Sequence, residues 1–146
     1  MTALEPLEAR LQRLEDLEAI RALFLEYQRR LDAKDFAGYG ALFAERGELV
    51  AGELHATGPA AIEQLVRSMV GSLLSASPGA DAHLVVNPSI ELDGDRATAR
   101  VTWVYLERGA DDRPQLSKLG HYDDELVRES GRWRFLRRSA PTDMPV

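Results

Sequence analysis

The chain has 146 residues, of which 45% are hydrophobic and 29% are charged, a length and balance typical of one soluble globular domain. The net charge of -6 argues against a nucleic-acid binder, because such proteins usually present a basic face. The absence of cysteine excludes a disulfide framework, a thiol nucleophile and a cysteine-ligated metal. No apolar run approaches the ~20 residues that span a bilayer, and the N-terminus lacks a signal-peptide pattern. We therefore expect a cytoplasmic protein with no membrane or nucleic-acid partner.

Apolar side chains recur at spacings of three and four over residues 7–31, which predicts a long amphipathic helix. The run exceeds the usual length of a globular helix, so residues 1–15 are interpreted as a helical arm. Two interpretations of the arm stay open: it packs on a neighbouring subunit, or it is a solvated extension. Lys34 and Asp35 interrupt the pattern, and a short second helix is predicted over residues 36–43, with Asp35 as its N-cap.

The next residues predict a short strand over 48–54 and a third helix over 60–75, opened by Gly58 and Pro59. Beyond residue 80 the hydrophobic period becomes that of a strand. Strands are predicted over residues 83–92, 96–108, 116–128 and 132–139, with tight turns at Asp93-Gly94 and Ser130-Gly131. In the last strand, Trp133, Phe135 and Arg137 are predicted to share one face, and the tail after residue 140 is predicted to be irregular.

Helices in the first half and antiparallel hairpins in the second half predict an α+β fold. Three N-terminal helices would pack in a strongly curved, mostly antiparallel sheet and enclose a pocket for a small molecule. The outer face of such a sheet needs cover. Trp103, or Thr102 and Val104 on the opposite face, would supply a subunit interface, so we expect a homo-oligomer, either a dimer or a trimer.

Four polar residues are candidates for chemistry. Asp32 lies near the end of the first helix and borders its apolar stripe, and a buried carboxylate is costly without a partner. His83 and His121 fall in predicted strands that could face it. A carboxylate beside an imidazole fixes the tautomer of the ring and raises its basicity, as general acid–base catalysis requires. Tyr27, on the same helix as Asp32, could polarise a carbonyl with its hydroxyl group.

Each candidate also has a structural interpretation. His83 could be a half-exposed residue at the start of a strand, and His121 a solvated rim residue. Asp32 could end its helix without a partner, and Tyr27 could lie in the core with its hydroxyl group hydrogen-bonded. His55 resembles a surface residue, and no close-spaced pair of ligands exists, so neither a metal nor a cofactor is predicted.

Four further residues are candidates for ligand contact. Trp103 and Tyr105 are interpreted as pocket wall or core, and Phe24 or Trp103 could stack on a ring held against the histidines. Asn87 could donate a hydrogen bond into the pocket or form a β-bulge.

The whole chain, taken as one domain over residues 1–146, resembles the nuclear transport factor 2-like superfamily, specifically its SnoaL-like branch. The strings that carry the resemblance are Leu17-Glu18-Ala19-Ile20-Arg21, Leu31-Asp32-Ala33-Lys34-Asp35-Phe36, His83 with Asn87-Pro88, Gly120-His121-Tyr122-Asp123-Asp124-Glu125-Leu126 and Gly131-Arg132-Trp133-Arg134-Phe135.

Among the site residues, the match is closest to scytalone dehydratase and the bile-acid dehydratases. The resemblance implies that Asp32 pairs with His121, that His83 is the second site histidine, and that Tyr27 is the tyrosine of the bile-acid enzymes. Leu31 is a departure, since the scytalone enzyme has a tyrosine at that position.

The resemblance implies a cofactor-independent dehydratase or isomerase that acts on a small cyclic carbonyl compound, such as a polyketide- or steroid-like molecule. His121, oriented by Asp32, would be the base and then the acid, while His83 and Tyr27 would hold or polarise an oxygen. Two alternatives remain open: a non-catalytic small-molecule-binding or scaffold protein, and a polyketide-cyclase-like enzyme.

Overall fold

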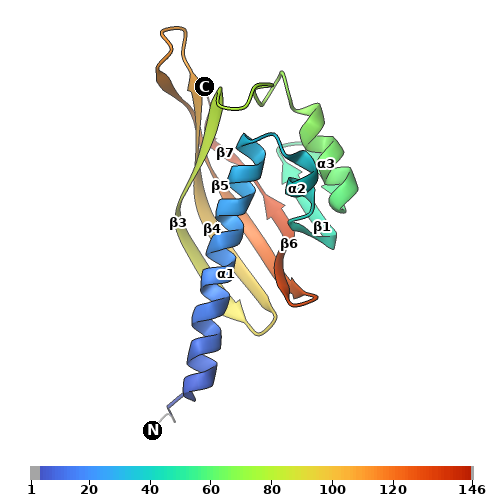
Figure 1. Cartoon of the computed structure of the whole chain (residues 1–146), viewed down its shortest axis with the longest axis vertical. Helices are drawn as coiled ribbons and strands as arrows, with labels where there is room; N and C mark the ends of the chain where they lie inside the picture. The colour runs from blue at the N-terminus through green and yellow to red at the C-terminus, as the bar shows by residue number, and fades with distance from the viewer. Residues whose placement is uncertain (1–3, 146) are drawn as a thin grey trace.

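A computed structural model describes residues 4–145, so residues 1–3, which begin the predicted arm, and residue 146 lie outside the described part. Helices α1 (Leu7–Asp32), α2 (Phe36–Gly40) and α3 (Pro59–Ser68) pack against a curved seven-stranded sheet (Figure 1). The α+β prediction, with three helices and a mostly antiparallel sheet, is confirmed. No helix within residues 4–145 is long and apolar enough to cross a bilayer.

The sheet has the strand order β2-β1-β6-β5-β4-β3, and β7 pairs with β5 beside this path. All pairs are antiparallel except β1 with β6, which run parallel. The strands are β1 (Phe43–Ala51), β2 (Leu54–Thr57), β3 (Asp81–Asp93), β4 (Arg96–Arg108), β5 (Pro114–Glu129), β6 (Arg132–Ser139) and β7 (Thr142–Met144). The long strands β3 to β5 therefore form consecutive hairpins, as the alternating pattern predicts.

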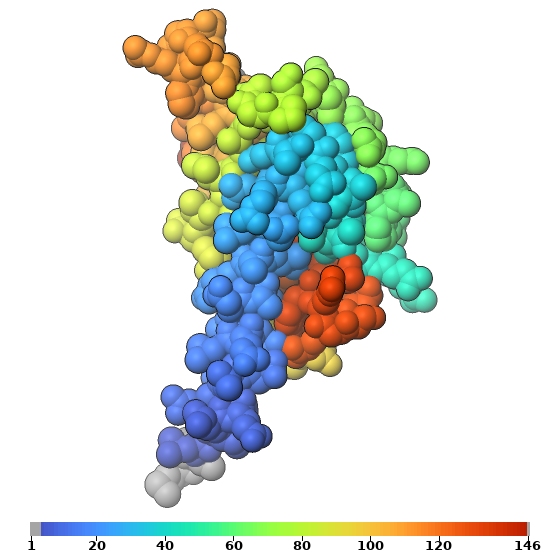
Figure 2. Space-filling model, viewed as in Figure 1, coloured from blue at the N-terminus to red at the C-terminus, as the bar shows by residue number. Residues whose placement is uncertain are grey.

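Helix α1 is continuous, and it packs on the sheet from Asp16 onward, where the carboxylate accepts a hydrogen bond of 3.1 Å from the indole N–H of Trp133. Ile20, Phe24, Tyr27 and Leu31 are buried there at helical spacing. In the first half the leucines face solvent, and this part of the helix extends beyond the rest of the molecule (Figures 1 and 2). The shape agrees with a helical arm, and its packing on a subunit stays a prediction.

The connection after α1 determines where the end of that helix lies. Lys34 adopts a positive φ of 61°, which turns the chain away from the helix axis. The carboxylate of Asp35 then accepts a hydrogen bond of 3.0 Å from the backbone N–H of Gly38. The predicted N-cap role of Asp35 is therefore confirmed.

Several element boundaries differ from the prediction. Helix α2 ends at Gly40, and β1 already begins at Phe43. The partner of Phe43 is Phe135 on β6, a strand far away in the sequence but adjacent in the sheet. Helix α3 stops at Ser68 instead of residue 75, because a turn at Gly71 (φ +88°) follows it. Strands β2 and β7 were not predicted, and each pairs along only a few residues.

Arg138 and Asp124 form a fully buried ion pair in the core. Two guanidinium nitrogens each donate a hydrogen bond of 2.7 Å to the carboxylate, and the guanidinium carbon lies 3.8 Å from the ring centroid of Tyr122. The predicted inward position of Arg137 is wrong: a register shift between β5 and β6 turns Arg137 outward and Arg138 inward. The pair fixes the inner face of the sheet under α1.

Candidate functional site

A cavity of about 280 Å³ lies between the helices and the inner face of the sheet. Its wall is largely apolar, and its polar members come from α1, α2 and the strands β3, β4, β5 and β7. The main lining residues are Tyr27, Leu31, Tyr39, Leu49, Val66, Met69, Leu74, His83, Trp103, Tyr105, Lys118 and Tyr122. An apolar hollow with a few polar groups is the usual form of a small-molecule site.

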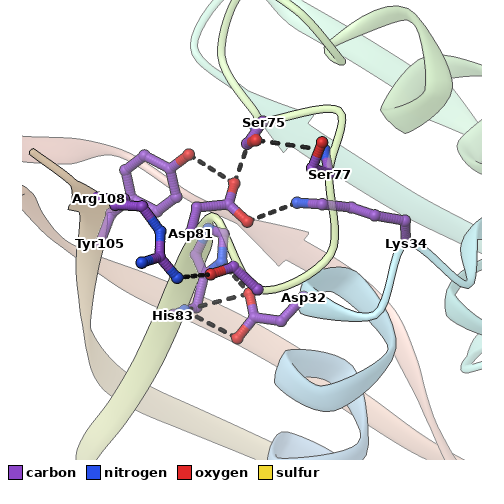
Figure 3. A network of polar contacts seen from close by, with 9 residues as sticks. Asp32, Lys34, Ser75, Ser77, Asp81, His83, Tyr105 and Arg108 are labelled. Carbon is purple, nitrogen blue, oxygen red and sulfur yellow. Dashed lines mark hydrogen bonds and ion pairs between the residues drawn. The ribbon is translucent and has the colours of Figure 1, made fainter. Parts of the chain in front are cut away.

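Asp32 and His83 form the central contact of this site (Figure 3). Asp32 is the last residue of α1, and His83 is the third residue of β3. Oδ1 of Asp32 lies 2.7 Å from Nδ1 of the ring, and both carboxylate oxygens accept from the backbone N–H of His83, at 2.9 and 3.1 Å. Because a carboxylate only accepts, Nδ1 donates the hydrogen of this contact, and in the neutral tautomer the lone pair lies on Nε2. Asp32 thereby fixes the orientation of an imidazole that lines the cavity.

A second carboxylate, Asp81, holds the surroundings of His83 in place. Lys34 donates to Oδ1 of Asp81 at 2.6 Å, while the hydroxyl of Tyr105 and the backbone N–H of Ser75 donate to Oδ2 at 2.7 and 2.9 Å (Figure 3). Burial alone would raise the pKa of Asp81, but the hydrogen bonds from Lys34, Tyr105 and Ser75 together lower it below its ordinary value. Asp81 therefore stays ionised inside the protein.

Tyr105 contacts both His83 and Asp81. Its ring centroid lies 4.7 Å from that of His83, and its hydroxyl group is held by Asp81. Burial first, and then the hydrogen bond to Asp81, raise the pKa of Tyr105. Tyr105 thus forms a fixed wall beside the imidazole.

Tyr27 and Tyr39 bring a pair of hydroxyl groups to the cavity wall. Their oxygens lie 2.5 Å apart, and burial raises the pKa of both groups. Tyr39 is the donor of this hydrogen bond, and Arg138 and Tyr122 also interact with the hydroxyl group of Tyr27. The two hydroxyl groups therefore belong to a buried polar cluster at the cavity wall.

The predicted pairing of Asp32 with His121 is wrong. Nδ1 of His121 lies 2.7 Å from Oδ2 of Asp143, and its Nε2 lies 3.2 Å from a carboxylate oxygen of Asp123. Successive side chains of a strand point to opposite faces, and the neighbouring Tyr122 is the residue that faces the cavity. His121 consequently lies on the outer face of the sheet, away from α1.

Two of the four predicted ligand-contact residues line the cavity, and two do not. Trp103 and Tyr105 line the cavity, whereas Phe24 is not among the lining residues and packs in the core, with its ring 6.2 Å from that of Phe135. Asn87 is exposed, has a positive φ of 54° and lies where the register between β3 and β4 shifts. The interpretation of Asn87 as a bulge-forming residue is therefore confirmed, and the prediction that it donates a hydrogen bond into the pocket is wrong.

Gly120 gives Trp103 its place in the wall. A Cβ at Gly120 would lie 2.1 Å from Cζ2 of the indole, so a larger residue there would displace the ring. The indole N–H of Trp103 donates to the backbone oxygen of His121 at 3.1 Å. The Gly-His string that carries the resemblance thus fixes a wall residue through its glycine.

Four site residues were missed by the sequence reasoning: Lys34, Tyr39, Asp81 and Lys118. Strand alternation could have suggested Asp81, because it lies two positions before His83 and shares its face. The three histidines lie apart, and no group of three or more metal-binding side chains occurs within residues 4–145.

Residues 12–139 match the family described as "SnoaL-like domain". The chain belongs to the SnoaL-like family. This SnoaL-like chain is also 41% identical over 58 residues to the uncharacterised protein Rv2910c of Mycobacterium tuberculosis. That match covers 39% of this chain and 40% of the relative, so the chain spans about two fifths of the length of the curated relatives it matches.

Solved structures share the fold of this SnoaL-like chain. An NTF2-like protein with a cystatin-like fold from Novosphingobium aromaticivorans has a TM-score of 0.81 and 28% identity, over 98% of this chain and 92% of that one. A protein provisionally named a scytalone dehydratase, from the same organism, has a TM-score of 0.74 and 27% identity, over 90% and 87%. ActVI-ORFA of Streptomyces coelicolor, at 22% identity, TM-score 0.75 and coverage of 87% and 96%, supports the fold alone.

Proposed function

We propose that this SnoaL-like protein is a cofactor-independent dehydratase or isomerase of a small cyclic carbonyl compound, with His83 as its acid–base residue. The observation that carries the proposal is the Asp32–His83 pair on the wall of an apolar cavity. The base is therefore assigned to His83 instead of His121. The similarity to a protein provisionally named a scytalone dehydratase supports the reaction class.

The cavity geometry is consistent with proton transfer at carbon. Nε2 of His83 would remove a proton from the carbon next to the carbonyl, and the electron pair of that C–H bond would form an enolate. The hydroxyl pair of Tyr27 and Tyr39 would donate to the enolate oxygen, a contact worth most where charge develops. Asp32 would stabilise the imidazolium that forms.

The second half of the reaction returns the proton. In a dehydration, the C–O bond of a hydroxyl group one carbon further breaks as the imidazolium of His83 protonates it, and water leaves. In an isomerisation, the proton returns to a different carbon. Neither path needs an oxidant or a reductant. The volume of about 280 Å³ favours a compact ring compound, below the usual size of drug-sized ligands.

The test compares His83→Gln with the wild type on a panel of cyclic β-hydroxy ketones, by the ultraviolet absorbance of the enone that dehydration forms. We expect kcat/KM to fall by about 10²–10⁴-fold, the usual contribution of a general acid–base group. His121→Asn is the matched control, because it removes an imidazole with a carboxylate partner from the outer face. A folded His83→Gln variant with the wild-type rate would overturn the proposal, and binding without turnover by the wild type would favour a binding protein.

A further inference from the structure

Lys118 is a cation of the cavity wall that has no carboxylate partner within residues 4–145. It lines the cavity from β5, and it makes no ion pair and no hydrogen bond within residues 4–145. The chain carries 24 acidic against 18 basic residues, so carboxylates are in surplus. The other lysine of the sequence, Lys34, has its carboxylate in Asp81. A partly buried ammonium without an anion is costly, and an anionic ligand would offset that cost.

The position of Lys118 relative to the proposed base follows from the sheet register. His83 on β3 pairs with Tyr105 on β4, and Tyr105 pairs with Lys118 on β5, so the three residues form one row across three strands. All three line the cavity. Neighbouring strands lie roughly 4.8 Å apart, so the backbones of His83 and Lys118 are separated by about 10 Å.

Tyr105 forms the floor between the two groups. Its ring centroid lies 4.7 Å from that of His83 and 5.6 Å from Nζ of Lys118. Its hydroxyl group is held by Asp81. A ring laid across Tyr105 would thus have the imidazole at one edge and the ammonium at the other.

We infer that the ligand of this cavity is a ring compound that carries a carboxylate, and that Lys118 is the residue that selects it. The inference rests on the proposed function in taking the cavity as the substrate site. Lys118 donates charge-assisted hydrogen bonds to the carboxylate, which anchors the ring with its reactive carbon toward His83. Lys118 is a specificity-determining residue and takes no part in the proton transfer.

The test measures the binding of two probes that differ in one charge, 1-naphthoate and 1-naphthamide, by isothermal titration calorimetry at low salt. We expect the wild type to bind the carboxylate about 10-fold or more tightly than the amide, since hydrogen bonds to charged groups contribute more than neutral ones. Lys118→Met, which keeps the apolar stem, should bind both probes equally, and Lys118→Arg should keep the preference. Arg100→Met is the control, because it removes an exposed cation of β4 without touching the cavity.

The outcomes separate this inference from the proposed function. His83→Gln should lose turnover and keep the preference for naphthoate. A preference that depends on Lys118 in a protein without any turnover would remove the dehydratase proposal and leave the ligand class in place. Equal binding of the two probes by the wild type, a preference that survives in Lys118→Met, or no binding of either probe would overturn the inference.

Discussion

His83 and His121 have the same local contact and opposite surroundings. In both residues a carboxylate oxygen lies 2.7 Å from Nδ1 of the ring, and in both the carboxylate comes from a different element of the fold. His83 packs on Tyr105 and lines the cavity. His121 lies on the outer face, and its carboxylate partner Asp143 has half of its side chain exposed.

The difference shows that an imidazole–carboxylate contact alone does not mark a catalytic site. The side chain of Asp32 is 21% exposed and that of Asp143 is 49% exposed, so water screens the contact of His83 less than that of His121. The site also needs an enclosed space in which a substrate can approach Nε2 of His83.

The largest effect is expected from Lys34→Met, which removes the cation that pairs with Asp81, two residues before His83 on β3. The carboxylate side chain of Asp81 is fully enclosed, and breaking a buried ion pair typically costs 3–5 kcal/mol. Two hydrogen bonds to Asp81 remain, so we expect a loss of about 3 kcal/mol in the free energy of unfolding, measured with urea.

The double variant Lys34→Met with Asp81→Asn is the control for that experiment. Removing the carboxylate as well should restore part of the lost stability, because no buried charge is then left without a cation. If Lys34→Met is as stable as the wild type, the ion pair does not hold the surroundings of His83.

A smaller effect is expected from Asp32→Asn, and the smallest from its outer-face counterpart Asp143→Asn. Asp32 accepts from both the ring and the backbone N–H of His83, and such bonds to a charged group contribute about 1.5–3 kcal/mol. Asp143 is exposed, so its loss should change the free energy of unfolding by less than about 0.5 kcal/mol. Equal losses in the two variants would contradict the distinction between the two faces.

The pH dependence of the free energy of unfolding tests the charge of Asp81 by itself. The pKa of Asp81 is lowered in the folded protein, so the folded state favours its ionised form. Its contribution to stability is therefore present above the ordinary pKa of 3.8 and is lost as the pH falls through the lower, folded value. The wild type should exceed Asp81→Asn in free energy of unfolding at pH 7, and the difference should shrink below about pH 4. A difference that is constant from pH 7 to pH 3 would show that Asp81 acts without its charge.

The fold was accessible from the sequence because its longest elements have strong local patterns. The apolar spacing of α1 and the turns at Asp93-Gly94 and Ser130-Gly131 identify a helix followed by hairpins. The short strand pairs β1–β2 and β5–β7 were missed, because strands that pair over only a few residues show little hydrophobic periodicity in the sequence. The inward position of Arg138 was also missed, because a register shift depends on the neighbouring strand.

The site was predicted in most of its residue types, but one pairing and two ligand contacts, those of Phe24 and Asn87, were predicted wrongly. Asp32, His83, Tyr27, Trp103 and Tyr105 all lie in or beside the cavity wall. The Asp32–His121 pair came from the resemblance, and the strand alternation at Tyr122 excludes it. Lys118 had no local signal, since its importance depends on two tertiary features: it lines the cavity, and it forms no ion pair with a carboxylate of residues 4–145.

The amino-acid sequence by itself determined the order of the helices and strands, the cap at Asp35 and the kinds of side chain available for chemistry, because these depend on neighbours within one or two turns of the chain. Only the tertiary structure decided which histidine meets Asp32 and which lysine, within residues 4–145, has a carboxylate partner. The physical reason is that strand register and sheet curvature assign each side chain to a face, and they are set by contacts between residues far apart in the chain.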